Sequence, residues 1–214
     1  MNRITIFANG NIPSASIYLP PNQIILAADG GARHCLKLGI KPQVVIGDFD
    51  SLLDEEIAAL EADNITLIRY PKDKDNTDLE LAIDYAAREL DARQITLYGL
   101  LGGRWDMTFA NMLLLASPRY AGIKFQVIDG NTTAYILRGG ETLDIQGQPG
   151  TTVSVIPLDS PAIGVTYQGL QWPLENTTLY FSNPRGVSNS MTTTQAKISL
   201  QQGILLVLKI DSVN

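Results

Sequence analysis

Short apolar runs that each lead into an aspartate-containing loop dominate the first half of this chain. The runs cover residues 24–28, 44–46, 65–68 and 95–98. Read as strands, they alternate with helical patterns, which indicates a mainly parallel sheet covered by helices. The carboxyl ends of parallel strands meet at one edge of the sheet, where open α/β folds bind ligands. We therefore expect these acidic loops to form one crevice.

The loops after these runs are rich in carboxylates. They contain Asp29, Asp48, Asp50, Asp75, Asp78 and Asp106. So many like charges in one crevice would repel each other unless a cation lay among them, and oxygen ligands of this kind suit Mg²⁺. Asp48 and Asp50 are two residues apart, so in an extended segment both side chains face the same side and could share one ion. Taken alone, this pair is equally consistent with a solvated turn.

Two features of the same loops suit phosphate. Thr77 and Asp78 open a predicted helix, whose first N–H groups favour anions. Gly102 and Gly103 supply flexible backbone N–H groups, and Arg104 supplies a guanidinium. Each feature alone is commonly just a helix start or a turn. Their joint occurrence after successive strands favours a binding site.

Helical periodicity is confined to the first part of the chain. It predicts helices over residues 32–38, 54–61 and 77–90, and a further helix after Asp106 with Phe109, Met112, Leu113 and Ala116 on one face. From residue 134 onward the pattern is of short strands, at 135–137, 152–156, 163–167, 178–181 and 204–208, separated by glycine turns. We predict a Rossmann-like α/β domain over residues 1–132 and an antiparallel β-sandwich or barrel over residues 133–214.

Composition narrows the function classes. The 214 residues are 45% hydrophobic with a formal charge of −6, which fits a soluble globular protein and argues against a nucleic-acid binder. No segment approaches the roughly 20 apolar residues that span a bilayer, and the N-terminus lacks a signal-peptide pattern. Cys35 is the single cysteine, which together with these absences favours the cytoplasm. His34 is the single histidine, so multi-histidine zinc sites and Ser-His-Asp sites are poorly supported.

Four segments, in order along the chain, resemble the signatures of the thiamine pyrophosphokinase family. They are residues 28–32 (ADGGA), 47–51 (GDFDS), 72–78 (KDKDNTD) and 102–106 (GGRWD), and residues 169–172 and 186–189 resemble parts of the family's second domain. The resemblance implies transfer of a diphosphoryl group from ATP to the hydroxyl of thiamine, giving thiamine diphosphate and AMP. In such transfers a protein mainly positions groups and neutralises charge.

The resemblance also implies roles for individual residues. The catalytic set would be Asp48, Asp50, Asp75, Asp78 and Asp106, with Mg²⁺ held by Asp48, Asp50 and Asp78. The ATP-binding set would be Asp29, Gly30, Gly31, Lys72, Lys74, Thr77, Gly102, Gly103 and Arg104. Thiamine would contact Ser188, Asn189 and Met191.

Some of these implied roles have competing interpretations. Core filling competes with a thiamine contact for Met191, and Trp172 is interpreted as a core or subunit-interface residue. Lys74 departs from the glutamine of animal members, so its role is open. The family also implies a homodimer, with thiamine between the α/β domain of one subunit and the β domain of its partner.

Two other functions compete with this one. The first is a diphosphokinase of the same architecture that acts on another hydroxymethyl heterocycle, such as a pterin. The second is a non-catalytic regulator that binds Mg-nucleotide or thiamine. The acidic crevice favours thiamine on independent grounds, because thiamine carries a fixed positive charge that carboxylates attract.

Overall fold

In the computed structural model, which describes residues 2–13, 17–159 and 161–212, the chain divides into two units. The first comprises Met1–Leu115 and Phe125–Gly130, and we call it the α/β unit. The second comprises Ala116–Lys124 and Asn131–Asn214, and we call it the β unit. The division near residue 130 lies two residues before the predicted domain boundary, and residues 116–124 join the second unit.

The α/β unit is built on a sheet with the strand order β6-β5-β1-β2-β3-β4. Its strands are β1 (Asn2–Phe7), β2 (Ile24–Ala28), β3 (Val44–Gly47), β4 (Thr66–Arg69), β5 (Ala92–Tyr98) and β6 (Lys124–Asp129). Strand β1 pairs in parallel with both β2 and β5, and β3 pairs in parallel with β2 and β4. The chain therefore proceeds outward from β1 through β4 and then returns to the other side of β1, which creates a switch point in the strand order.

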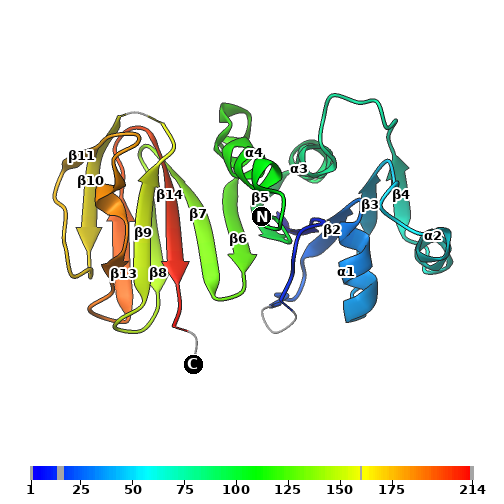
Figure 1. The fold of residues 1–214 in the computed structure, drawn as a ribbon, viewed down its shortest axis with the longest axis horizontal. Helices are drawn as coiled ribbons and strands as arrows, with labels where there is room; N and C mark the ends of the chain where they lie inside the picture. Colours follow the sequence, from blue (N-terminus) through cyan, green and yellow to red (C-terminus); the bar gives the residue numbers. More distant parts are fainter. Residues whose placement is uncertain (1, 14–16, 160, 213–214) are drawn as a thin grey trace. The chain divides into compact units, whose positions relative to one another are not determined.

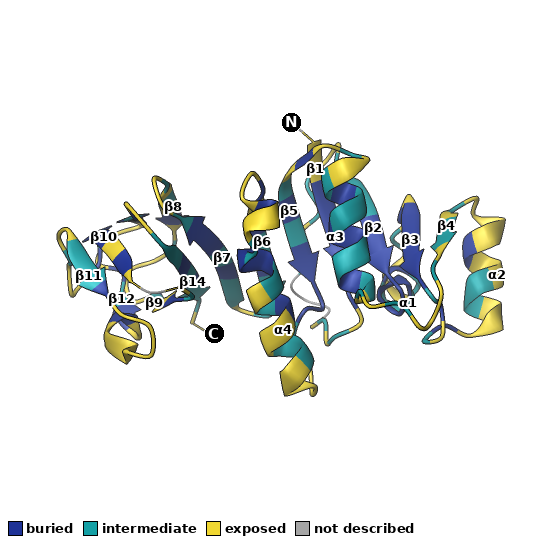
Figure 2. Ribbon diagram, turned by 90° about the horizontal axis from the view of Figure 1, so that it is seen from above, coloured by how far each residue is buried: buried dark blue, intermediate teal, exposed yellow. Residues whose placement is uncertain are grey.

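Four helices cover the sheet of the α/β unit on both faces. They are α1 (Gly31–Leu38), α2 (Asp54–Ala62), α3 (Asp78–Arg88) and α4 (Trp105–Ala116). Helices α1 and α2 lie on one face, and α3 and α4 lie on the other (Figure 1). The predicted mainly parallel α/β architecture is thus confirmed, and its inner strands, unlike the edge strand β4, are largely buried (Figure 2).

The helix boundaries follow from local chemistry. The Thr77 side chain accepts a hydrogen bond from the Glu80 N–H at 3.2 Å and caps α3, so the helix begins one residue later than predicted. Gly39 ends α1 in the left-handed conformation, with φ 65°. Helix α3 buries Leu79, Ala82, Ile83 and Ala86, the apolar face that the sequence spacing indicates.

Helix α4 differs from its prediction in two ways. It begins at Trp105, so Asp106 lies in its first turn instead of before it. Only part of the predicted apolar face is in the core: Ala116 is buried and Met112 is half-buried, but Phe109 and Leu113 are exposed. Leu115, which was not on the predicted face, is fully buried. Trp105, Phe109 and Leu113, each four residues from the next, are exposed and form a stripe along this helix. Figure 2 shows that much of α4 is exposed.

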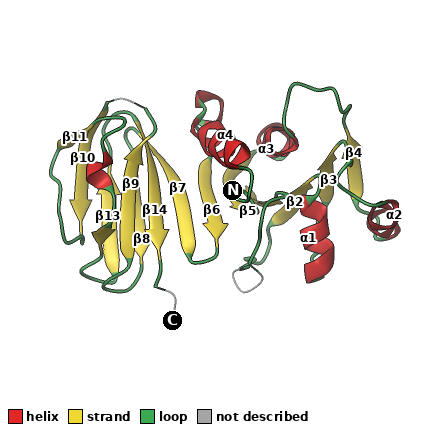
Figure 3. Cartoon of the chain, viewed as in Figure 1, coloured by secondary structure: helices red, strands yellow, loops and turns green. Residues whose placement is uncertain are grey.

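The β unit contains two antiparallel sheets, with strand orders β12-β9-β14-β7 and β11-β10-β13-β8. The strands are β7 (Thr132–Arg138), β8 (Thr142–Gln146), β9 (Thr152–Pro157), β10 (Ala162–Gln168), β11 (Thr177–Leu179), β12 (Asn189–Ser190), β13 (Gln195–Ser199) and β14 (Ile204–Ile210). Their inward side chains form one apolar core, which includes Val155, Val165, Ile198 and Val207. The predicted β-sandwich is confirmed (Figure 3).

Sequence reasoning missed three strands of the β unit, β8, β12 and β13, and made β11 too long at its end. No α-helix occurs among the described residues after 134, as predicted, but one 3-10 turn, η3 (Pro184–Gly186), does. A second 3-10 turn, η2 (Pro118–Tyr120), follows α4. None of the helices in the described part of the chain is long and apolar enough to cross a membrane.

Candidate active site

A cleft of about 450 Å³ lies at the carboxyl ends of the strands in the α/β unit, a volume typical of small-ligand sites. Its lining includes Asp29 after β2, Asp50 after β3, Thr77 and Asp78 at the start of α3, and Arg104 before α4. The predicted meeting of the four acidic loops is therefore confirmed. The cleft also receives the loop after β1, which lies next to β5 at the switch point.

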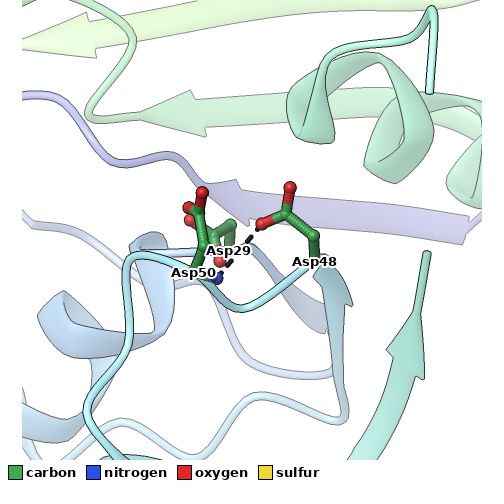
Figure 4. A group of neighbouring side chains, drawn as sticks. All are labelled: Asp29, Asp48 and Asp50. Atoms are coloured by element: carbon green, nitrogen blue, oxygen red, sulfur yellow. Dashed lines mark hydrogen bonds between the residues drawn. The ribbon is translucent and has the colours of Figure 1, made fainter. Parts of the chain in front are cut away.

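Three carboxylates, of which Asp29 and Asp50 line the cleft, form a group that could hold a metal ion. One oxygen from each of Asp29, Asp48 and Asp50 lies within 4.8 Å of the other two. Figure 4 shows these side chains gathered together, with the Asp50 N–H donating to Asp48 Oδ1 at 3.1 Å. Asp29 is only 4% exposed, and its Oδ1 has no hydrogen-bond partner among the described residues. An orphaned buried carboxylate oxygen beside two other carboxylates fits a hard divalent cation such as Mg²⁺.

The predicted metal set differs from this group by one member. The observed group contains Asp29 in place of Asp78. Asp78 instead pairs with Lys74, whose Nζ lies 2.9 Å from Asp78 Oδ1 and 3.1 Å from Asp48 Oδ2. Burial raises the pKa of Asp78, and the nearby Asp29 and Asp48 charges add to this, against the lowering effect of Lys74. For Asp48, burial acts in the same direction but is outweighed by the Asp50 N–H and Lys74, so its pKa is lowered.

Close packing and backbone conformation hold the acidic loops in place. A Cβ at Gly47 would lie 2.8 Å from the Asp29 Cβ and 3.2 Å from Asp78 Oδ1, so only glycine fits between these two carboxylates. Asp29 and Phe49 have φ values of 44° and 66°, in the left-handed region that non-glycine residues seldom occupy. Arg69 steadies Phe49, because its guanidinium stacks over the ring at 4.6 Å and donates to the Asp48 carbonyl.

The remaining predicted residues of the α/β unit lie around the cleft rather than at its acidic centre. Lys72 is an exposed partner of Asp50, with 2.7 Å between Nζ and Oδ2, and Asp75 is exposed. Arg104 lines the cleft with Gly102 and Gly103. Its Nε donates to Asp106 Oδ1 at 2.9 Å, and this side-chain hydrogen bond lowers the pKa of Asp106 to about 2. Asp106 is therefore a partner of Arg104 in this structure, separate from the carboxylate group.

Gly30 and Gly31 have a packing role in addition to any ligand role. A Cβ at Gly31 would collide with the Phe7 carbonyl, and one at Gly30 would collide with the Asn9 side chain. The start of α1 thus lies directly against the end of β1. Sequence reasoning missed the loop after β1, where Asn9 and Gly10 line the cleft. The signal that could have found it is again a strand end, because Asn9-Gly10 follows an apolar run there, although this loop carries no carboxylate.

A second pocket, of about 470 Å³, lies in the β unit. Tyr167, Trp172, Arg185 and Ser188 are among its lining residues. Trp172 is 57% exposed, so its interpretation as a core residue is wrong. The Tyr167 hydroxyl is buried without a hydrogen-bond partner among the described residues, and burial raises the pKa of this phenol above its usual range. An exposed indole beside polar groups makes this pocket suitable for a flat heterocyclic ligand.

The predicted thiamine residues take different positions in the β unit, and two of them line this pocket. Ser188 is an exposed lining residue with φ 59°, and its N–H donates to Ser154 Oγ at 2.9 Å. Asn189 is buried, accepts from the Trp172 N–H at 3.1 Å and donates to the Trp172 carbonyl at 2.7 Å. Asn189 thereby fixes the backbone that carries the exposed indole. Met191 is 2% exposed within the core of the β unit, which agrees with the core-filling interpretation.

Comparison with known proteins agrees with this division of the chain. The family model described as thiamin pyrophosphokinase, catalytic domain, matches residues 16–127, and the one described as thiamin pyrophosphokinase, vitamin B1 binding domain, matches residues 141–205. A thiamine pyrophosphokinase of Bacillus subtilis (strain 168) is 29% identical over 212 residues, which cover 98% of this chain and 99% of the relative.

Solved structures extend the likeness to the fold. The crystal structure of thiamine pyrophosphokinase from Bacillus subtilis has a TM-score of 0.88 and 28% identity, and the match covers 99% of this chain and 100% of that one. Thiamin pyrophosphokinase from Candida albicans is 17% identical with a TM-score of 0.77, over 98% of this chain and 89% of that one. At that identity the second likeness concerns the fold alone.

Proposed function

This chain belongs to the thiamin pyrophosphokinase family, and on that premise we propose which of its residues bind Mg²⁺, ATP and thiamine. The chain is an enzyme that transfers a diphosphoryl group to the hydroxyl of thiamine, and ATP is the proposed donor. Neither the pterin-specific alternative nor the non-catalytic regulator finds support among its relatives. The observation that carries the residue assignment is the group of three carboxylates beside a ligand-sized cleft.

We propose that Asp29, Asp48 and Asp50 hold Mg²⁺ and that Asp78 lies next to it. The orphaned Asp29 oxygen and the spacing of the carboxylate oxygens support this set. When bound, the ion would neutralise charge on the transferring phosphates. The carboxylates also attract the positively charged thiamine ring toward the crevice, which raises its local concentration there.

The ATP phosphates are proposed to lie between the start of α3 and the loop before α4. Both segments line the cleft, and the first offers helix N-terminal N–H groups while the second offers Gly102, Gly103 and Arg104. Arg104 is mostly exposed and its pair with Asp106 is at the surface, so the guanidinium can exchange Asp106 for a phosphate at little cost. Asp106 would then act before ATP binds, by orienting Arg104 toward the cleft.

We propose that thiamine binds in the pocket of the β unit. Trp172 offers an exposed aromatic face, which attracts the cationic thiazolium ring through a cation–π interaction. Ser188 lines the same pocket and offers a hydroxyl. The Asn189 side chain instead forms hydrogen bonds with the Trp172 backbone and so holds the indole in position. Met191 is left out of the proposed contacts because it is enclosed in the core.

A homodimer is proposed as the assembled form, with thiamine between the α/β unit of one subunit and the β unit of its partner. Exposed apolar side chains on both units support an assembly that covers them. On α4 these are Trp105, Phe109 and Leu113, at 74%, 62% and 55% exposure, and on the β unit they include Tyr180 and Phe181. Sedimentation at micromolar concentration tests this, and a stable, active monomer would refute it. A cytoplasmic location is also proposed, on the basis of the single cysteine.

The deciding experiment measures AMP release from ATP and Mg²⁺ with thiamine, with a hydroxymethyl pterin, and with no acceptor. We expect AMP only with thiamine. Michaelis constants then separate the two ends of the site: Ser188→Ala should raise the constant for thiamine, and the loss of one hydrogen bond in a pocket costs roughly 1–3 kcal/mol. A constant for thiamine that is unchanged in Ser188→Ala would exclude Ser188 from the acceptor pocket.

A further inference from the structure

Lys74 lies between two carboxylates of the proposed catalytic cleft. Its Nζ is 3.1 Å from Asp48 Oδ2 and 2.9 Å from Asp78 Oδ1, and its side chain is only 12% exposed. A partly buried ammonium group is costly unless it is paired, and here two carboxylates pair with it, Asp48 after β3 and Asp78 at the start of α3. The position joins the loop after β3 to the start of α3, so Lys74 links two parts of the cleft.

The charges around Lys74 indicate what it does. Asp29, Asp48, Asp50 and Asp78 carry four negative charges, and among the described residues Lys74 and Lys72 form ion pairs with them. Arg33 also acts on Asp29 but is itself paired with Glu56. The carboxylates therefore outnumber the cations paired with them, which favours a divalent cation in their midst. However, Asp48 has both oxygens engaged, with Oδ1 accepting from the Asp50 N–H and Oδ2 facing Lys74. A metal ion that uses Asp48 fully must therefore compete with Lys74.

We propose that Lys74 is a tethered counter-ion that competes with Mg²⁺ for Asp48 and so weakens metal binding in the absence of nucleotide. The inference rests on the proposed metal site at Asp29, Asp48 and Asp50. While no metal ion is bound, Lys74 neutralises Asp48 and Asp78 and keeps the two loops together. When an ion binds Asp48, Lys74 gives up that contact and keeps its contact with Asp78.

Lysine suits this role because of its shape. Its ammonium is a point charge on a flexible stem, so it can leave one partner while it keeps another. Lys72 provides a contrast within the same loop, since it pairs with Asp50 at 2.7 Å but has a side chain that is 79% exposed. Solvent and salt screen an exposed pair, so Lys72 should compete with a metal ion far less than Lys74 does.

The test is direct measurement of Mn²⁺ binding without nucleotide, by electron paramagnetic resonance of the free ion, on the wild type, Lys74→Met and the matched control Lys72→Met. Methionine keeps much of the stem and removes the charge. We expect Lys74→Met to bind Mn²⁺ roughly tenfold or more tightly, because a like charge adjacent to the site is removed. We expect Lys72→Met to change the affinity less than about threefold, because its pair is screened.

Melting temperatures in EDTA provide an independent readout. Lys74→Met should melt below the wild type in EDTA, because Asp48 and Asp78 lose their counter-ion, and should gain more from added Mn²⁺. Unchanged or weaker Mn²⁺ binding in Lys74→Met, alongside normal binding by the wild type, would overturn the counter-ion role and leave the metal site intact. If neither protein bound Mn²⁺, the proposed metal site itself would be refuted, and the inference with it.

Discussion

Asp29 offers the sharpest test of the acidic cleft, because its removal should affect stability and activity in opposite directions. The side chain is 4% exposed, one oxygen has no hydrogen-bond partner among the described residues, and Asp48 and Asp50 oxygens lie within 4.8 Å. Asn has the same shape and tolerates the left-handed backbone at this position, so Asp29→Asn should fold normally.

The expected size follows from the charges. Two like charges about 5 Å apart repel by roughly 3 kcal/mol at an effective dielectric constant of 20. Arg33, which acts on Asp29, and the nearby Lys72 and Lys74 offset part of this, so we expect Asp29→Asn to raise the free energy of unfolding without metal by about 1–3 kcal/mol. For a chain of this size that corresponds to an increase in melting temperature of roughly 2–10 °C. Turnover with Mg²⁺ should fall by about 10²-fold or more, because a charged metal ligand is lost.

The assay pairs thermal melting in EDTA and in Mg²⁺ with AMP release. Asp106→Asn is the matched control, since Asp106 is an exposed carboxylate bonded to Arg104 and stands outside the carboxylate group. Its melting temperature should not rise in EDTA. If Asp29→Asn instead melted lower than the wild type in EDTA and retained turnover, Asp29 would be a structural residue and the proposed metal set would be wrong.

Further predictions concern other parts of the site. Asp48→Asn and Asp50→Asn should each reduce turnover by about 10²-fold or more while the protein still folds, and normal turnover at saturating Mg²⁺ would contradict the assignment. Arg104→Ala should raise the Michaelis constant for ATP more than that for thiamine. Trp172→Ala should do the reverse by roughly fivefold or more, since a desolvated cation–π contact contributes about 1–2 kcal/mol. Cys35 is fully buried with a pKa raised to about 12 by burial, so it should resist a thiol reagent at pH 8 until the protein is denatured.

The predictable part of the fold is the part governed by local patterns. Helix α3 has both an apolar period and a Thr77 cap, and Gly39 marks the end of α1, so both helices are visible in the sequence. The missed strand β13 alternates buried Ala196 and Ile198 with polar residues, but it is short and half polar. Phe109 and Leu113 of α4 were predicted to face the core but are exposed. Hydrophobic spacing shows that a helix has an apolar face, but it does not show what covers that face.

The site divides in the same way. Strand-end position is a sequence property, so the meeting of Asp29, Asp50 and Asp78 could be predicted from it. Which carboxylates could share an ion depends on how closely the loops approach each other. The sequence predicted Asp48, Asp50 and Asp78, whereas the structure groups Asp29 with Asp48 and Asp50 and pairs Asp78 with Lys74. The position of Lys74 between two loops depends on the same three-dimensional approach, so no spacing rule could have predicted it.

The backbone of the acidic loops explains why the cleft requires these residue types. Asp29 and Phe49 adopt left-handed φ values, and Gly47 has no room for a Cβ between Asp29 and Asp78. Strained conformations of this kind cost of order 1 kcal/mol or more each and persist only where the surrounding structure fixes them. Here the strain directs carboxylates of different loops toward one point against their mutual repulsion. A chain selected only for stability would remove both the backbone strain and the repulsion between carboxylates. Their joint presence is therefore explained by a cation that the cleft must bind.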